Sequence, residues 1–143
     1  MQRVRSASVE IEASTSSKIE KGILILLGVV KGDSEEDARF LANKIAGLRI
    51  FPDGNKNMNL DVREVSGATL VVSQFTLAGD WRKGRRPSFV NAAEPQEGEA
   101  LYEHFCDILS MEMPVHTGKF GAMMNVRLEN DGPVTFVLDS KLK

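Results

Sequence analysis

The densest group of charged side chains is a run of four cations within five positions, Arg82, Lys83, Arg85 and Arg86, next to Trp81. Arginine binds phosphate through paired hydrogen bonds, and cations that displace condensed counterions favour nucleic acid. The indole could offer a surface for base stacking, although a single tryptophan is more often packed in a core. The pattern leaves two interpretations equally open, a phosphate-binding loop and an ordinary solvated loop.

A second candidate is Ser73-Gln74-Phe75-Thr76-Leu77, where an apolar strand becomes polar at its carboxyl end. Ligands of α/β proteins bind at the carboxyl ends of strands, and backbone N–H groups exposed there can stabilise an oxyanion. In the alternative interpretation Gln74 and Thr76 face solvent while Phe75 and Leu77 pack. The pattern alone favours this alternative.

The third candidate is the segment at residues 130–135, with the sequence Asn-Asp-Gly-Pro-Val-Thr. Asp-Gly is a turn signal, and an X-Pro bond is cis in only about 5–6% of cases in folded proteins. The residues therefore predict a plain turn with a trans bond. A cis bond would instead direct two carbonyls to the same side and form a rigid pair of acceptors.

Conventional side-chain catalysis has little support in the sequence. No GxSxG elbow surrounds Ser73 or Ser88, and His104 and Cys106 stand two positions apart on a predicted helix, where they do not face each other. We expect His104 on the solvated side of that helix and His116 in a structural role within a strand. With two histidines and no CxxC or HExxH motif, we expect neither a metal site nor a cofactor.

The elements that must position these candidates alternate between strands and helices. A helix is expected after Asp33 or Ser34, with acidic residues in its first turn, and a second helix is expected from Pro95. Residues 14–17 and 130–133 are predicted to be turns, and residues 78–88 a polar loop. Apolar patterning predicts strands at residues 2–4, 7–12, 23–30, 48–51, 68–77, 115–120, 122–129 and 134–138. This order indicates an α/β protein with mixed sheet packed against about two helices.

Length and composition predict one compact domain over residues 1–143, because the chain has 143 residues of which 42% are hydrophobic. No apolar stretch is long enough to span a bilayer, and no signal peptide is visible. With a single cysteine the chain is expected to be a soluble cytoplasmic protein that contacts no membrane. The net charge of −2 argues against a surface that is basic throughout, and it leaves room for a local basic patch.

Taken together, these segments resemble one family, the D-aminoacyl-tRNA deacylases. The similarity extends in order over essentially the whole chain, and the Ser-Gln-Phe-Thr and Gly-Pro-Val-Thr segments are its most specific parts. The segments that carry it are Gln2-Arg3-Val4, Ile50-Phe51, Met58-Asn59-Leu60, Leu70-Val71-Val72 with residues 73–77, Arg86-Pro87-Ser88-Phe89, Thr117-Gly118-Lys119-Phe120 and residues 130–135.

The resemblance implies a D-aminoacyl-tRNA deacylase-like fold and a homodimer with two active sites at its interface. Members hydrolyse the ester between a D-amino acid and the terminal adenosine of tRNA and reject L-aminoacyl-tRNA. The bond between Gly132 and Pro133 would be cis. The two residues would enter the active-site pocket of the partner subunit, where their carbonyls exclude an L side chain. Arg3 would hold this motif through its planar set of donors.

The resemblance also places Ser73, Gln74, Phe75 and Thr76 around the reacting ester, with the N–H groups of Phe75 and Thr76 stabilising the oxyanion. Thr76 is a nucleophile candidate by position, but no base stands beside it in the sequence. We therefore favour activation of water by the 2′-hydroxyl of the substrate's own ribose. The resemblance implies that Phe120 and Met124 contact the adenosine, although both could equally pack in the core. It also implies that acceptor-stem phosphates are bound by Arg82, Lys83, Arg85 and Arg86.

Two alternatives remain beside this expectation. One is a dimeric nucleic-acid-binding module without catalysis that uses the cationic run. The other is an esterase that acts on free amino-acid esters. Incubation with matched D- and L-aminoacyl-tRNA separates all three, and glycine mischarged on tRNA is a further possible substrate.

Overall fold

The centre of the fold is a pair of buried parallel strands, β3 and β6, in a mixed sheet ordered β2-β1-β3-β6-β7. The structure, a computed structural model, describes residues 1–142. β8 also pairs with β1, which makes six strands in this sheet, and β4 and β5 form a separate hairpin. The strands are β1 (Gln2–Ile11), β2 (Ser14–Ile19), β3 (Gly22–Leu27), β4 (Phe51–Pro52), β5 (Met58–Leu60), β6 (Ala68–Ser73), β7 (Val115–Thr117) and β8 (Asn125–Thr135).

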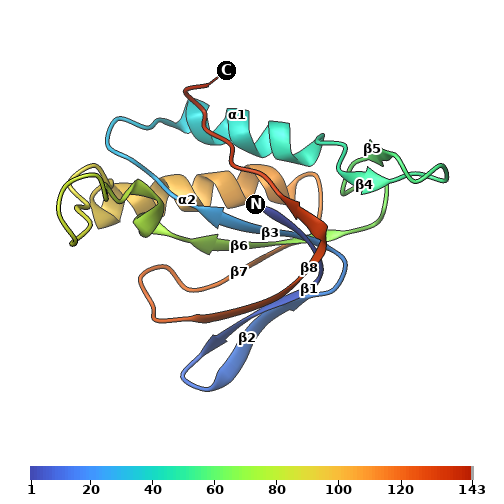
Figure 1. Ribbon diagram of the computed structural model, residues 1–143, viewed down its shortest axis with the longest axis horizontal. Helices are drawn as coiled ribbons and strands as arrows, with labels where there is room; N and C mark the ends of the chain where they lie inside the picture. The colour runs from blue at the N-terminus through green and yellow to red at the C-terminus, as the bar shows by residue number, and fades with distance from the viewer. Residues whose placement is uncertain (143) are drawn as a thin grey trace.

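Both helices cover the same face of the sheet (Figure 1). α1 (Glu35–Ala46) begins at Ser34, whose backbone N–H donates to the carboxylate of Asp37 at 2.9 Å, and α2 (Pro95–Ser110) begins at a proline. The carboxylate of Asp37 gives the Ser34 N–H a partner, while the proline of α2 removes an N–H that would have no acceptor in the first turn. The two helices pack on each other and on the sheet, so the predicted α/β class is confirmed.

Each buried strand contributes to two cores, because successive side chains of a strand point to opposite faces. Ile25 and Val71 belong to the core beneath the helices. Leu24 and Leu70 belong to a second core, which β1, β2 and β8 enclose where they curl away from the other face (Figure 1). Burial on both faces is the reason that these strands have nearly continuous apolar sequences.

The serine-rich stretch at residues 14–17 lies in a strand, so the predicted turn is wrong there. Ser14–Ile19 is β2, a strand at the edge of the sheet whose side chains are mostly exposed. The turn stands just before it, at Glu12 and Ala13, which both have a positive φ, 51° and 62°. An edge strand needs few apolar side chains, which explains why the pattern missed it.

The predicted break at residues 130–133 is also wrong, because β8 continues through it to Thr135. The register shifts instead: between Val4 and Gln2 the pairing moves two residues along β1 and five along β8, from Asn130 to Thr135. The additional residues of β8 leave the ladder as a bulge. We call residues 131–133 the Gly-Pro bulge.

The C-terminal residues return from β8 to the start of α1 (Figure 1). Lys141 Nζ lies 2.8 Å from Asp37 Oδ2 and 3.5 Å from Asp33 Oδ1. The hydrogen bond from Lys141, with that from the Ser34 backbone, holds the pKa of Asp37 well below its usual range. The described residues include no helix with the length and apolarity needed to cross a membrane.

Candidate active site

The predicted strand through Leu77 ends earlier, at Ser73, and the chain turns into a short 3-10 helix, η1 (Phe75–Ala78). The N–H of Gln74 makes the last bond to β3, to the carbonyl of Leu27 at 2.8 Å. Phe75 and Leu77 are 57% and 60% exposed, so the interpretation in which they pack within a strand is wrong. We call residues 73–76 the SQFT turn.

The SQFT turn presents backbone donors. The first N–H groups of a helix have no acceptor inside it, and in η1 these belong to Phe75 and Thr76. The carboxamide of Gln74 donates to the hydroxyl of Thr76. Because an amide is not a base, this contact does not activate Thr76 as a nucleophile. The turn can stabilise negative charge on an oxygen, and it offers no acid-base pair of its own.

Gly28, which the sequence analysis did not single out, makes room for this turn. A Cβ at Gly28 would stand 3.0 Å from Leu77 Cβ and 3.2 Å from the carbonyl oxygen of Gln74. Gly28→Val is therefore expected to displace the SQFT turn and lower kcat/KM for the substrate proposed below at least ~10-fold. Gly54→Val, at a glycine with open space around it and without a positive φ, tests the general cost of valine in a connecting segment. Equal losses in the two variants would contradict the expectation.

Phe89 is a second residue that the sequence analysis did not assign to the site. Its ring stands edge-on to that of Phe75, with the centroids 5.0 Å apart. A Cβ at Gly79 would approach the Phe89 ring to 2.9 Å, so the close contact requires glycine there. The two partly exposed rings form an aromatic surface beside the SQFT turn, suited to stacking on a base. The signal in the sequence was the aromatic residue that follows the cationic run.

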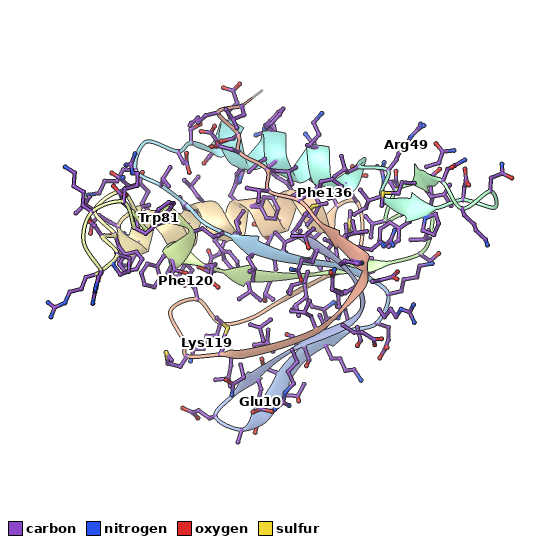
Figure 2. All side chains as sticks on the ribbon, viewed as in Figure 1. Glu10, Arg49, Trp81, Lys119, Phe120 and Phe136 are labelled. Atoms are coloured by element: carbon purple, nitrogen blue, oxygen red, sulfur yellow. The ribbon has the colours of Figure 1, made fainter. Side chains whose placement is uncertain are left out.

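The cationic run lies in an exposed loop, at whose base Asp80 and Ser88 form an antiparallel β-bridge. Arg82 pairs with Asp80 at 2.8 Å, which lowers the pKa of that carboxyl to about 2. The other three cations form no ion pair within residues 1–142. Trp81 is 78% exposed, so its expected packing is wrong: it projects with the loop beyond the sheet (Figure 2). We call residues 81–87 the basic loop.

Phe120 and Met124 are both half-buried, and they pack against different cores. The ring of Phe120 lies 6.0 Å from that of Tyr102, beneath the helices. Met124 packs against the second core, and its sulfur would stand 2.6 Å from a Cβ at Gly118. Both side chains therefore have structural contacts of their own at this end of the sheet.

The histidines and the cysteine lie apart from the SQFT turn in the sequence and make no catalytic pair. His104 is half-buried, and its Nε2 atom has no hydrogen-bond partner among the described residues, so its expected solvation is wrong. Burial raises the pKa of the Cys106 thiol to about 11, while His116 is exposed on β7. Within residues 1–142, no three His, Cys, Asp or Glu side chains gather closely enough to hold a metal ion.

Arg3 holds the Gly-Pro bulge. It is 8% exposed; its Nε donates to the carbonyl of Asp131 at 3.1 Å, and its Nη1 donates to the carbonyl of Ile50 at 2.6 Å. The bond between Gly132 and Pro133 is cis, as the family resemblance implied and contrary to the expectation from turn residues alone. Gly132 has φ +137°, a conformation that an L side chain rarely adopts.

The bulge and the SQFT turn stand at opposite ends of the sheet. Asn130 lies opposite Val4, Val4 opposite Gly22, and Gly22 opposite Ala68, the first residue of β6. Ser73 is its last, about 16 Å further along at ~3.3 Å per residue. Figure 2 shows the same separation, with Trp81 at one end and Arg49, next to Ile50, at the other. A single chain therefore does not bring the two motifs together.

These features define a small α/β protein with a donor-lined turn at one end of its sheet and a rigid Gly-Pro bulge at the other. The family model described as D-Tyr-tRNA(Tyr) deacylase matches residues 1–139, and the chain belongs to this family. It is 58% identical to a D-aminoacyl-tRNA deacylase of Geobacter sulfurreducens, over 99% of this chain and 93% of that one. It is 55% identical to one of Persephonella marina, over 99% and 96%.

Two solved structures share the fold. One, titled c-Myc DNA Unwinding Element Binding Protein, is 37% identical with a TM-score of 0.91, and the match covers 96% of this chain and 95% of that one. The other is titled as a probable eukaryotic D-amino acid tRNA deacylase, with 19% identity, a TM-score of 0.74 and 92% of each chain covered. At that identity the second likeness concerns the fold alone.

Proposed function

We propose that this protein hydrolyses the ester that joins a D-amino acid to the 3′-terminal adenosine of tRNA, and that it does so in the cytoplasm. The relatives that carry the name D-aminoacyl-tRNA deacylase match it over nearly their whole length. The observation that carries the proposal is the donor-lined SQFT turn: the N–H groups of Phe75 and Thr76 have no acceptor within η1, and the described partner of the Thr76 hydroxyl is an amide and not a base. Such a turn suits a reaction that needs an oxyanion stabilised and whose substrate supplies its own hydroxyl.

The active unit in this proposal is a homodimer, in which the Gly-Pro bulge of one chain meets the SQFT turn of the other. An apolar groove of about 360 Å³ supports it, since Leu26, Leu77, Leu128 and Phe136 line this groove and are each more than a third exposed. Gln2 lines it too, with a buried Oε1 that lacks a partner among the described residues. A two-fold pairing through such a surface would bury the apolar side chains and form both sites at once.

In the proposed reaction, the oxygen of a water molecule attacks the ester carbonyl. The carbonyl oxygen becomes an oxyanion that accepts hydrogen bonds from the N–H groups of Phe75 and Thr76. The ribose 2′-hydroxyl passes the proton of the water to the departing 3′-oxygen, which leaves tRNA with a free 3′-hydroxyl and a free D-amino acid. Ser73 and Gln74 shape the turn, and Phe120 and Met124 border the adenosine.

Selectivity for the D enantiomer would come from the partner's bulge. The carbonyls of Gly132 and Pro133 accept hydrogen bonds from the substrate's amino group, which fixes the orientation of its Cα. An L side chain would then collide with the bulge, while a D side chain points away from it. Glycine has no side chain to collide, so glycine mischarged on tRNA passes the same filter.

The proposal is tested by incubating the protein with matched D- and L-aminoacyl-tRNA and measuring release of the amino acid. Hydrolysis of the D form with survival of the L form is expected. Survival of both with retained RNA binding would indicate the non-catalytic nucleic-acid-binding module instead. Equal hydrolysis of free D-aminoacyl esters and of the tRNA ester would indicate a general esterase.

The basic loop is expected to bind acceptor-stem phosphates through Arg82, Lys83, Arg85 and Arg86. Arg85→Met should therefore raise KM for D-aminoacyl-tRNA and reduce the slope of log(kcat/KM) against log[salt] by about 1, with kcat unchanged. Lys18→Met, an equivalent change on the exposed edge strand, should leave both quantities unchanged. D-aminoacyl-adenosine has no acceptor stem, so an equal loss with this substrate would contradict the assignment.

A further inference from the structure

The side chain of Asn130 forms hydrogen bonds that hold both ends of the Gly-Pro bulge. Its Nδ2 donates to the carbonyl of Arg3 at 2.9 Å and to the carbonyl of Val134 at 3.0 Å. The first acceptor lies on β1 and the second follows the bulge on β8, so the carboxamide joins the two ends of the bulge to the neighbouring strand. A carboxamide has two N–H donors, and both are used here.

The inner side of the bulge is tightly packed, although Gly132 and Pro133 are themselves exposed. Val134 is 7% exposed, and a Cβ at Gly132 would lie 2.6 Å from Val134 Cγ2 and 3.2 Å from Arg3 Nη2. The carboxylate of Asp131 is placed between Arg3 at 3.3 Å and Arg5 at 3.5 Å. The buried guanidinium of Arg3 therefore holds the bulge at Asp131, and Asn130 holds the two ends of the bulge.

We infer that Asn130 is a positioning residue that sets the enantiomer selectivity of the reaction, an inference that rests on the proposed function. Asn130 does not touch the substrate. It fixes where the carbonyls of Gly132 and Pro133 stand in the partner's site. Rejection by steric collision depends on placement to within a fraction of an ångström, because the repulsion falls steeply with distance. Without the hydrogen bonds of Asn130 the bulge can shift, so that an L side chain fits and the D substrate binds more weakly.

The test is Asn130→Asp, which keeps the shape of the side chain and removes both donors. The readout is the ratio of kcat/KM for D-aminoacyl-tRNA to that for L-aminoacyl-tRNA, measured at high enzyme concentration. Unfolded protein lowers both terms equally, so the ratio reports only on the folded site. We expect the ratio to fall at least ~10-fold, the effect of about 1.4 kcal/mol. Asn125→Asp, the same change at the start of β8, should leave it unchanged.

An unchanged ratio with Asn130→Asp would overturn the inference, whether or not both rates fall, because a purely structural role lowers them together. If the aspartate variant does not fold, Asn130→Ser, which keeps a single donor on a shorter side chain, is judged by the same ratio. Failure of the proposed function is separate and visible in the wild-type protein, which would then hydrolyse neither substrate or both equally.

Discussion

A D-aminoacyl-tRNA whose terminal adenosine carries hydrogen in place of the 2′-hydroxyl is expected to be hydrolysed at least ~100-fold more slowly than the natural substrate. A positioned acid-base group contributes about 10²–10⁴-fold to a rate. Around the SQFT turn, the partner of the Thr76 hydroxyl is the carboxamide of Gln74, which cannot accept a proton at neutral pH. In the proposed reaction the proton acceptor is therefore the substrate's own 2′-hydroxyl. Single-turnover hydrolysis at saturating enzyme measures the effect on chemistry separately from binding.

Thr76→Ala is the matching change on the protein side. This variant should keep its rate within about threefold, because the backbone N–H of residue 76 remains and only the hydroxyl is lost. Inhibition of the natural reaction by the deoxy substrate shows that it still binds. Normal hydrolysis of the deoxy substrate, together with complete loss of activity in a folded Thr76→Ala variant, would make Thr76 the nucleophile.

Arg3→Met is expected to lower the free energy of unfolding by about 3–6 kcal/mol and kcat/KM for D-aminoacyl-tRNA at least ~100-fold. Methionine fills most of the volume, but it leaves the carbonyls of Ile50 and Asp131 without their donor, and hydrogen bonds to charged groups are each worth about 1.5–3 kcal/mol. The loss of activity follows because the bulge is no longer held against β1. Chemical denaturation and steady-state kinetics measure the two effects.

Arg5→Met is the matched control for Arg3→Met. The side chain of Arg5 is 68% exposed and reaches the same carboxylate of Asp131, at 3.5 Å. Its removal should change stability by less than about 0.5 kcal/mol, as is typical of an exposed ion pair. Equal losses in the two variants would show that positive charge beside Asp131 matters and that the buried contacts of Arg3 do not.

Much of the fold can be predicted from local pattern. The apolar runs around Ile23 and Leu70 indicate the central strands because both of their faces are buried, and the acidic first turn after Ser34 indicates α1. The wrong predictions also have physical reasons. An edge strand such as β2 needs no apolar alternation, and a bulge within β8 is indistinguishable in sequence from a break between two strands.

The sequence by itself determined the α/β class, the two helices, the central strands and the residue types of both motifs. Only the tertiary structure decided that the SQFT turn leaves the strand at Ser73, that Trp81 is exposed, and that the two motifs stand at opposite ends of the sheet. It also showed that Asn130 holds the bulge, and it gave the contacts through which Arg3 takes the role that the family resemblance implied. The physical reason is distance along the chain: Arg3 contacts Ile50 and Asp131 across 47 and 128 positions, and no local spacing records such contacts.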